Sequence, residues 1–422
     1  MNTPVDTARP GEDPLASRIS KPRRRFFLVW AGLFVIWAAV MVAIASAMPD
    51  LYYYSYYSVD YSLGFIRRGL AGELPDVIPG GYFSDLRILR WAPTVVYTLA
   101  MATVALVAAR RFGASERRLM LALSVPILPF GFAFALFSAR PDLIGAAALA
   151  LFAAFLAAEP RSARTVVIAS SVYGAASVPL TLVHEATPFL YALGAVAVTA
   201  TFARHCSPHV QRWSSALAVA PGALAGLAVA LLGLRGVSAE LCALTPRGSL
   251  NNPFAGRPDF AELLRGFRHT VDYRDWTCQY IFPYFDQGFG DALRFVAGRG
   301  VLPLLSSLIF GIFVFWVTMV AISNVSGVPL ARFTQLLRGR AAWVLAGLAM
   351  LTPVFLTGVD WTRWLVVISY DIGLAYLLFA SSQPESALPA TRRNLRVFVT
   401  GTTLLAIFPI GLIPGFAGVI PW

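Results

Sequence analysis

The run Phe26–Met48, FFLVWAGLFVIWAAVMVAIASAM, decides the fold class of this chain. It carries no charged side chain, and it is long enough to cross a bilayer as a helix, which takes about 20 residues. Ala45-Ser46-Ala47 resembles the cleavage site of a signal peptide. The apolar core is too long for a signal peptide and further apolar runs follow, so we expect an uncleaved first membrane helix.

About ten more apolar runs of roughly 17–23 residues follow along the chain. They cover about 91–109, 119–137, 142–158, 165–183, 186–203, 213–234, 301–322, 341–357, 364–380 and 397–413. The chain is 57% hydrophobic and 13% charged, which no soluble domain can bury. We predict an all-α, polytopic integral membrane protein with about 11 transmembrane helices. Closed β-barrels are excluded, because their strands are short and alternate in polarity.

The net charge of +12 suggests a nucleic-acid partner, but its distribution argues against one. Basic residues cluster before the first apolar run and in short loops between later ones, the pattern of cytoplasmic segments in a plasma-membrane protein. They include Arg23–Arg25, Arg110, Arg111, Arg117, Arg118, Arg161, Arg164, Arg204, Arg212, Arg338, Arg340, Arg392 and Arg393. We predict a disordered cytoplasmic tail over 1–25 and a single transmembrane domain over 26–422. Its extracytoplasmic loops lie at about 49–90 and 235–300.

The first outer loop reads PDLYYYSYYSVDYSLGFIRRGLAGEL and joins many tyrosines to Asp60, Arg67, Arg68 and Glu73. An interfacial aromatic belt with solvated charges is one interpretation. A binding site is the other. Arginine forks suit a lipid phosphate, and a carboxylate can take the proton of a sugar hydroxyl.

Other ionisable residues fall in outer turns. Arg140 and Asp142 are either a local ion pair at a helix start or part of a site. His184 and Glu185 stand at the outer end of a helix among apolar neighbours, where a charge is costly unless paired or used. Asp360 and Arg363 are three residues apart, so they form either an intrahelical salt bridge or part of a site.

Asp371 falls in the middle of an apolar run. A carboxyl at that depth is a functional or structural-partner candidate, but the depth argues against a role at the outer surface.

Cys242 and Cys278 share the second outer loop, where the compartment permits a disulfide, whereas Cys206 falls in a cytoplasmic loop and should stay free. Two cysteines alone leave the bridge open. Walker, HExxH, CxxC, GxSxG and dinucleotide motifs are absent. We therefore expect no cofactor and no dedicated metal site.

This layout resembles the GT-C superfamily of membrane glycosyltransferases. The likeness rests on a cytoplasmic N-terminus with one helix, an acidic residue early in a long first outer loop, and about 11 spans with further long outer loops. It implies a polyprenyl-phosphate sugar donor and a general base in the first outer loop. Asp60 is the best match to that base, with Asp50 second. The paired-acid signature of the superfamily is missing here. Size and composition are similar to actinobacterial members that transfer mannose or arabinofuranose to an envelope glycan or glycolipid.

The resemblance implies an inverting reaction at the extracytoplasmic face. Asp60 would deprotonate an acceptor hydroxyl, which attacks the anomeric carbon. The phosphate would leave against Arg67, Arg68 or Arg140. The predicted substrate-binding residues are Glu73, Asp142, His184, Glu185, Asp360 and Arg363. Three alternatives stay open: a transporter or flippase, another envelope enzyme such as a ligase or acyltransferase, and a non-catalytic scaffold.

Overall fold

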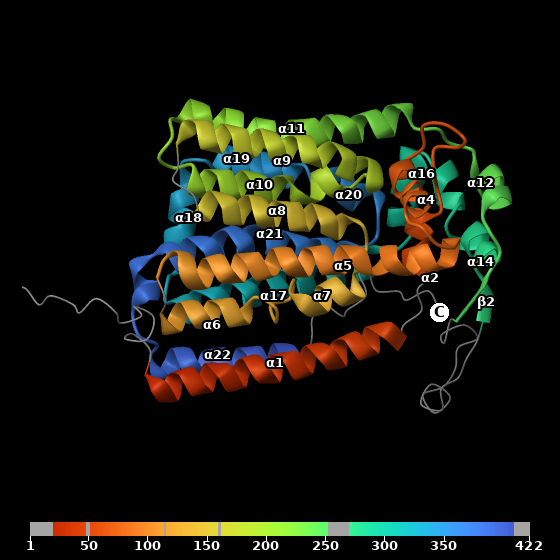
Figure 1. Cartoon of the computed structure of the whole chain (residues 1–422). Coiled ribbons are helices and arrows are strands. Elements are labelled where there is room, and N and C mark those ends of the chain that lie inside the picture. The colour runs from red at the N-terminus through yellow and green to blue at the C-terminus, as the bar shows by residue number, and fades with distance from the viewer. Residues whose placement is uncertain (1–19, 48–50, 114, 159–161, 252–269, 409–422) are drawn as a thin grey trace, which may run out of the picture.

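The computed structural model describes residues 20–47, 51–113, 115–158, 162–251 and 270–408, and its long helices run roughly parallel or antiparallel to one another as a bundle (Figure 1). The longest are α1 (Lys21–Ala47), α5 (Tyr82–Leu106), α9 (Ala163–Val183), α11 (Pro208–Leu232), α17 (Val301–Ser326) and α21 (Trp361–Ser382). Each of these six is long and apolar enough to cross a membrane. The prediction of a helical multi-pass membrane protein is confirmed.

A seventh span is formed if α18 (Leu330–Arg338) and the segment Ala341–Thr357 are counted together, across a bend of 96°. The latter segment holds α19 (Ala341–Ala349) and α20 (Thr352–Thr357). Two further apolar helices, α8 (Asp142–Ala158) and α10 (Thr187–Phe202), are shorter. The predicted number of 11 spans therefore stays a prediction.

The predicted continuous helix over 119–137 is wrong. The chain instead forms α6 (Glu116–Ser124) and α7 (Phe132–Phe137), separated by turns. Pro126 and Pro129 explain the break, because proline lacks an N–H donor and its ring clashes with the preceding turn. The Phe132 N–H instead donates to the Pro126 carbonyl at 2.7 Å, which closes the turn.

Two predicted boundaries also move. The first outer loop ends at Gly81, not at residue 90, because α5 begins at Tyr82 with Gly81 as its N-cap. Helix α1 begins at Lys21, so residues 21–25 of the predicted tail are helical; residues 1–19 lie outside the described part. The predicted last helix is seen as α22 (Arg392–Ile407), and α1 contacts it through the Trp37 indole, which donates to the Ala406 carbonyl.

The bundle core lies around α21, which packs against α17, α10 and α8. Small residues bring these helices together. Gly194 of α10 lies against Leu149 of α8 and Asp371 of α21, and a Cβ at position 194 would come within 2.6 Å of the Asp371 Oδ1. Nearly all of α10 is buried. Its short length is therefore compatible with a place inside the protein.

Short elements gather at one end of the bundle, at the right of Figure 1, which we call the loop end. It consists of the described residues within 51–81 and 233–300. Its elements are α2 (Leu51–Tyr54), η1 (Ser55–Tyr57), α3 (Gly69–Gly72), α4 (Leu74–Val77), α12 (Ser238–Leu244), β1 (Ser249–Asn251), β2 (Thr270–Asp272), α14 (Tyr273–Tyr280), α15 (Pro283–Asp286) and α16 (Phe289–Ala297). Strands β1 and β2 pair antiparallel, with Ser249 opposite Asp272. Cys242 of α12 and Cys278 of α14 form a disulfide, which the sequence had left open. Cys206 is free, as the sequence predicted.

Candidate functional site

Three arginine–carboxylate pairs meet where the loop end joins the bundle. We call these six residues the ion-pair cluster: Arg68 with Glu185, Arg140 with Asp360, and Arg363 with Asp142. Arg68 donates from Nε and Nη2 to the two Glu185 oxygens, at 2.8 Å each. Arg363 Nη2 donates to both oxygens of Asp142, at 2.6 and 2.5 Å. Charge-assisted contacts of this kind are the strongest side-chain hydrogen bonds in proteins.

The pairing differs from the local pairs that the sequence suggested. Neither Arg140 with Asp142 nor Asp360 with Arg363 forms a salt bridge. Each residue instead pairs across to the other segment, so the turn before α8 and the start of α21 are fastened together twice. The backbone gives the reason. Asp360 is the N-cap of α21, with φ −78° and ψ 38°, so it does not share helical geometry with Arg363.

Two tyrosines of the first loop connect the pairs. The Tyr52 and Tyr56 hydroxyls are hydrogen-bonded at 2.9 Å. The Arg140 guanidinium lies 5.0 Å over the Tyr52 ring, and the Arg68 guanidinium lies 5.0 Å over the Tyr56 ring. Cations over aromatic faces are attracted by the ring quadrupole. The tyrosine run therefore lines the site and is more than an interfacial belt.

His184 completes the cluster from the end of α9. Its ring stacks on the Tyr56 ring with centroids 5.6 Å apart, and it is 6% exposed. Its Nδ1 is buried without a hydrogen-bond partner. Burial lowers the pKa of His184 to about 4, although the nearby Asp142 charge acts in the opposite direction. The imidazole is therefore neutral at pH 7.

The Arg68–Glu185 pair fixes an unusual backbone. Arg68 has φ 66° and ψ 6°, a left-handed conformation that non-glycine residues rarely adopt. Burial alone would raise the pKa of Glu185, but the Arg68 charge outweighs burial and holds this pKa well below its usual range. A carboxylate held in this way is a poor proton acceptor near pH 7.

Asp60 has different neighbours. Its Oδ1 accepts hydrogen bonds from the N–H and the hydroxyl of Ser62, at 2.9 and 2.5 Å. Among the residues that the structure describes, no arginine forms an ion pair with Asp60. Gly72 packs against the Asp60 backbone. Gly72 ends the short helix α3, whose N-cap is Arg68.

Arg67 and Glu73 make their side-chain contacts outside the ion-pair cluster, although the Arg67 and Glu185 charges act on each other. Arg67 lies 4.5 Å over the Phe285 ring and donates to the Tyr284 carbonyl, and burial lowers its pKa to about 10. Glu73 accepts from the Tyr61 N–H at 2.9 Å. Both therefore hold the first loop together, Arg67 by joining it to α15. Asp50, the second candidate base, lies outside the described residues.

Within the described residues, no group of three or more His, Cys, Asp or Glu side chains could hold a metal ion. The six charged side chains of the ion-pair cluster neutralise one another instead.

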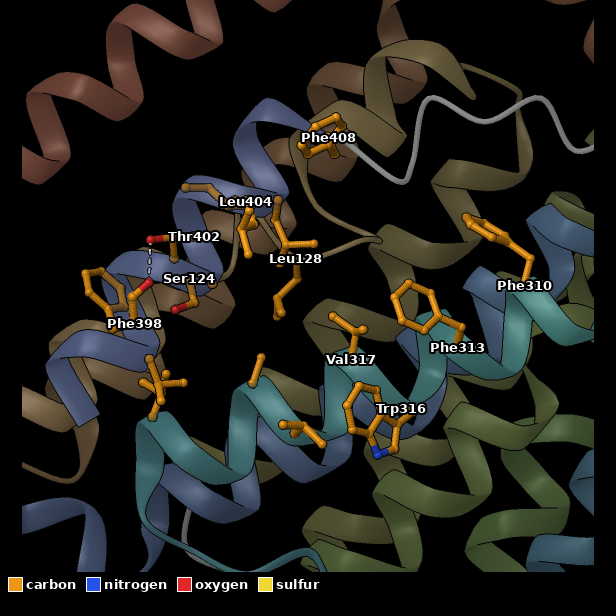
Figure 2. A pocket seen from close by; sticks show the side chains of 17 residues that line it. Ser124, Leu128, Phe310, Phe313, Trp316, Val317, Phe398, Thr402, Leu404 and Phe408 are labelled. Carbon is orange, nitrogen blue, oxygen red and sulfur yellow. Dashed lines mark hydrogen bonds between the residues drawn. The ribbon is translucent and has the colours of Figure 1, made fainter. Parts of the chain in front are cut away.

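A separate apolar cavity of about 510 Å³ lies between α17, α22 and the α6–α7 connection (Figure 2). Figure 2 shows Phe310, Phe313 and Trp316 along one wall and Phe398 and Leu404 along the other. Its hydroxyl groups are bonded within their own helices; Thr402, for example, donates to the Phe398 carbonyl at 2.6 Å. The apolar lining suits a hydrocarbon chain and contains no side chain suited to catalysis.

Sequence reasoning missed Thr187 and Tyr191, which lie one helical turn apart on α10, just after His184. Both are buried, and both hydroxyls lack a hydrogen-bond partner. The signal was a hydroxyl at i+3 and a second at i+7 from an ionisable residue inside an apolar run.

Comparison with known proteins places the chain in a family of membrane proteins. The family described as uncharacterised membrane protein Rv1490 matches residues 27–406. The chain is 35% identical over 402 residues to the uncharacterised protein Rv1490 of Mycobacterium tuberculosis and to the uncharacterised protein Mb1527 of Mycobacterium bovis. Each alignment covers 94% of this chain and 92% of the relative. No solved structure matches.

Proposed function

The chain belongs to the family described as uncharacterised membrane protein Rv1490, and we propose that it is an inverting membrane glycosyltransferase of the GT-C type. It would transfer a sugar from a polyprenyl-phosphate donor to a glycan or glycolipid of the cell envelope, at the extracytoplasmic face. The observation that carries this proposal is the convergence of three arginines, three carboxylates, a neutral histidine and a tyrosine pair at one end of the bundle.

The arginines suit a lipid phosphate. A guanidinium has five N–H donors, and Glu185 takes the Nε and one Nη2 donor of Arg68. Arg140 contacts Asp360 through Nη1. Each guanidinium thus keeps donors for a leaving phosphate, whose developing charge it would stabilise. The ring faces of Tyr52 and Tyr56 are already covered by these arginines, so we assign the tyrosines to positioning the cations.

Asp60 is the proposed base. Although burial opposes it, the Arg68 charge lowers the pKa of Glu185 and so its basicity, and Asp142 and Asp360 are each paired with an arginine. Asp60 instead accepts hydrogen bonds from Ser62 in its own turn. It would take the acceptor hydroxyl proton as the oxygen attacks the anomeric carbon and the phosphate leaves. The disulfide supports the extracytoplasmic placing of this end, because such bonds persist in oxidising compartments. No cofactor is required.

The test is transfer of radiolabelled sugar from polyprenyl-phosphate mannose and polyprenyl-phosphate arabinofuranose to an envelope-lipid extract. Purified wild type and Asp60→Asn are compared. We expect transfer by the wild type and a loss of about 10²–10⁴-fold in the variant, the usual contribution of a general base. Asp286→Asn is the matched control, since Asp286 also accepts from the N–H and hydroxyl of a loop-end serine, Ser238. Transfer that survives Asp60→Asn would move the base elsewhere. If the wild type transfers sugar from neither donor, the proposal that the chain is a glycosyltransferase is refuted.

A transporter or flippase of a lipid-linked substrate is the second candidate. The observation that favours it is Asp371, a fully buried carboxyl in the middle of α21. Ionisable residues inside membrane spans often mark transport routes. Vesicle uptake or lipid translocation that depends on Asp371, without sugar transfer, would support this candidate over the enzyme.

A further inference from the structure

Asp371 is a fully buried acidic group of the described bundle, and neither the ion-pair cluster nor the proposed reaction uses it. Its side chain is 0% exposed, and neither carboxyl oxygen has a hydrogen-bond partner. The Gly194 N–H comes near without forming a bond of standard geometry. An isolated charge in such surroundings costs far more than neutralising it. The Asp371 carboxyl is therefore protonated.

The surroundings hold no cation that would change this conclusion. The titratable groups that face Asp371 are four buried tyrosines, one each from α5, α9, α10 and α21: Tyr97, Tyr173, Tyr191 and Tyr370. Three of them lie within the core around α21, where the Tyr370 ring is 5.8 Å from Tyr97 and 6.2 Å from Tyr191. Among the described residues, no salt bridge reaches Asp371.

A line of polar groups joins Asp371 to the ion-pair cluster. It begins at His184 and continues along one face of α10 through Thr187 and Tyr191 to Gly194, the residue against which Asp371 packs. Thr187, Tyr191 and Gly194 are spaced by 4 and 3 residues on α10, so they share a helix face. His184 lies just before this helix, and its carbonyl accepts from the Thr187 N–H at 3.0 Å. Their exposure falls from 6% at His184 to 3% at Thr187, 1% at Tyr191 and 0% at Asp371. The line therefore leads from the loop end into the protein interior.

The members of this line share an uncommon property. The His184 Nδ1, the Thr187 hydroxyl, the Tyr191 hydroxyl and both Asp371 oxygens are buried without hydrogen-bond partners. Buried polar groups in proteins are nearly always paired, so several orphans in succession need an explanation. Bridging water that relays a proton would satisfy all of them. From Thr187 to Gly194 the helix α10 rises by about 10 Å, roughly a third of the thickness of a bilayer core.

Two helices shape this line from the other side. A Cβ at Gly145 of α8 would meet the Thr187 methyl at 2.3 Å and the Tyr191 ring at 2.9 Å. Four residues on, Leu149 of α8 packs beside Gly194. Helices α8, α10 and α21 lie together in the centre of the bundle (Figure 1). The path is thus enclosed by protein, which favours a relay of protons over passage of a larger solute.

We propose that Asp371 is a proton-binding site in the membrane interior, filled from the loop end through His184, Thr187 and Tyr191. The proton moves by exchange: each group accepts one proton on one side and gives one up on the other. No bond other than O–H and N–H bonds forms or breaks. The proposal does not depend on sugar transfer.

Infrared spectroscopy of the full chain in lipid nanodiscs tests it. The difference between wild type and Asp371→Asn isolates the carbonyl stretch of the protonated carboxyl at pH 7. If the Asn variant does not fold, Asp371→Glu keeps the carboxyl and moves the band. In D₂O the band shifts as the proton exchanges, and the rate of this shift reports access to Asp371.

We expect the band in wild type and an exchange rate about tenfold slower in Tyr191→Phe, the effect of removing one relay hydrogen bond. Thr187→Val should act in the same direction. Tyr97→Phe is the matched control, because that buried tyrosine also faces Asp371 but its hydroxyl already donates to the Phe130 carbonyl at 2.6 Å. Absence of an Asp371-dependent band would refute the claim that the Asp371 carboxyl is protonated. Equal exchange rates in Tyr191→Phe and Tyr97→Phe would refute the claim that the proton travels through Tyr191.

Discussion

His184 is a base that the fold keeps neutral, and this has a consequence for stability. Its pKa falls from 6.5 to about 4 on folding. Below pH 6.5, His184 binds a proton in the unfolded chain but not in the folded chain. The free energy of unfolding therefore decreases as the pH falls from about 6.5 to 4. The full effect of this single group is about 3 kcal/mol.

We expect His184→Gln to flatten this part of the pH profile. Melting temperatures between pH 7.5 and 4.5, compared with wild type, provide the measurement. His209→Gln is the control, since His209 is exposed near the start of α11 and accepts from the Trp213 indole. Parallel profiles for wild type and His184→Gln would show that the imidazole titrates normally.

At the residue scale, the sequence predicted which side chains matter better than it predicted their partners. Arg140, Asp142, Asp360 and Arg363 were all named, and all four meet. Their pairing could not be read from spacing, because it depends on how the α7–α8 turn docks on α21. Asp60 stays a prediction, since its base role is a matter of chemistry that no contact settles.

At the element scale, the disulfide fastens α12 to α14 across 36 residues. Closing a loop of this length stabilises by about 3–4 kcal/mol in the chain-entropy description. We expect the double variant Cys242→Ala, Cys278→Ala to lose stability mainly at the loop end, because these short elements share little core with the bundle.

Limited proteolysis checks this expectation. Cleavage within 235–300 should become faster in the double variant, while cleavage in the turns at the opposite end should not change. Cys206→Ala, which removes the free cysteine, should match wild type. Uniform acceleration of cleavage at both ends would mean that the disulfide supports the whole bundle.

The hydropathy of the sequence predicted where most helices lie, but it did not predict where they begin, end or break. Residues 82–90 read as loop because they contain Asp85, Arg87 and Arg90, yet they form the first turns of α5. Arg90 explains this: it is 1% exposed and stacks 3.8 Å over the Trp91 ring. Hydropathy averaged over a window of sequence counts that arginine as polar, whereas in the structure aromatic rings cover its charge.

At the scale of the whole molecule, the number of membrane crossings is the least predictable quantity. Helices α8 and α10 are apolar but short, and they are surrounded by longer helices. An apolar run inside a large membrane protein is hydrophobic because it packs against protein, so composition cannot tell such a helix from one that meets lipid. The polar line on α10 was hidden for the same reason.

The orientation of the molecule is the last prediction. Arginines crowd the end opposite the loop end, so the positive-inside rule places that end in the cytoplasm and the loop end outside. In a Cys206→Ser background, Val77→Cys reports on the loop end, where Val77 is 79% exposed, and Ala163→Cys reports on the opposite end, where Ala163 is also exposed. A membrane-impermeant maleimide should label Val77→Cys in intact cells and Ala163→Cys only after permeabilisation. Cys242 and Cys278 stay silent because they are bonded to each other. The reverse pattern would put the ion-pair cluster in the cytoplasm, where a polyprenyl-phosphate donor acting outside could not reach it.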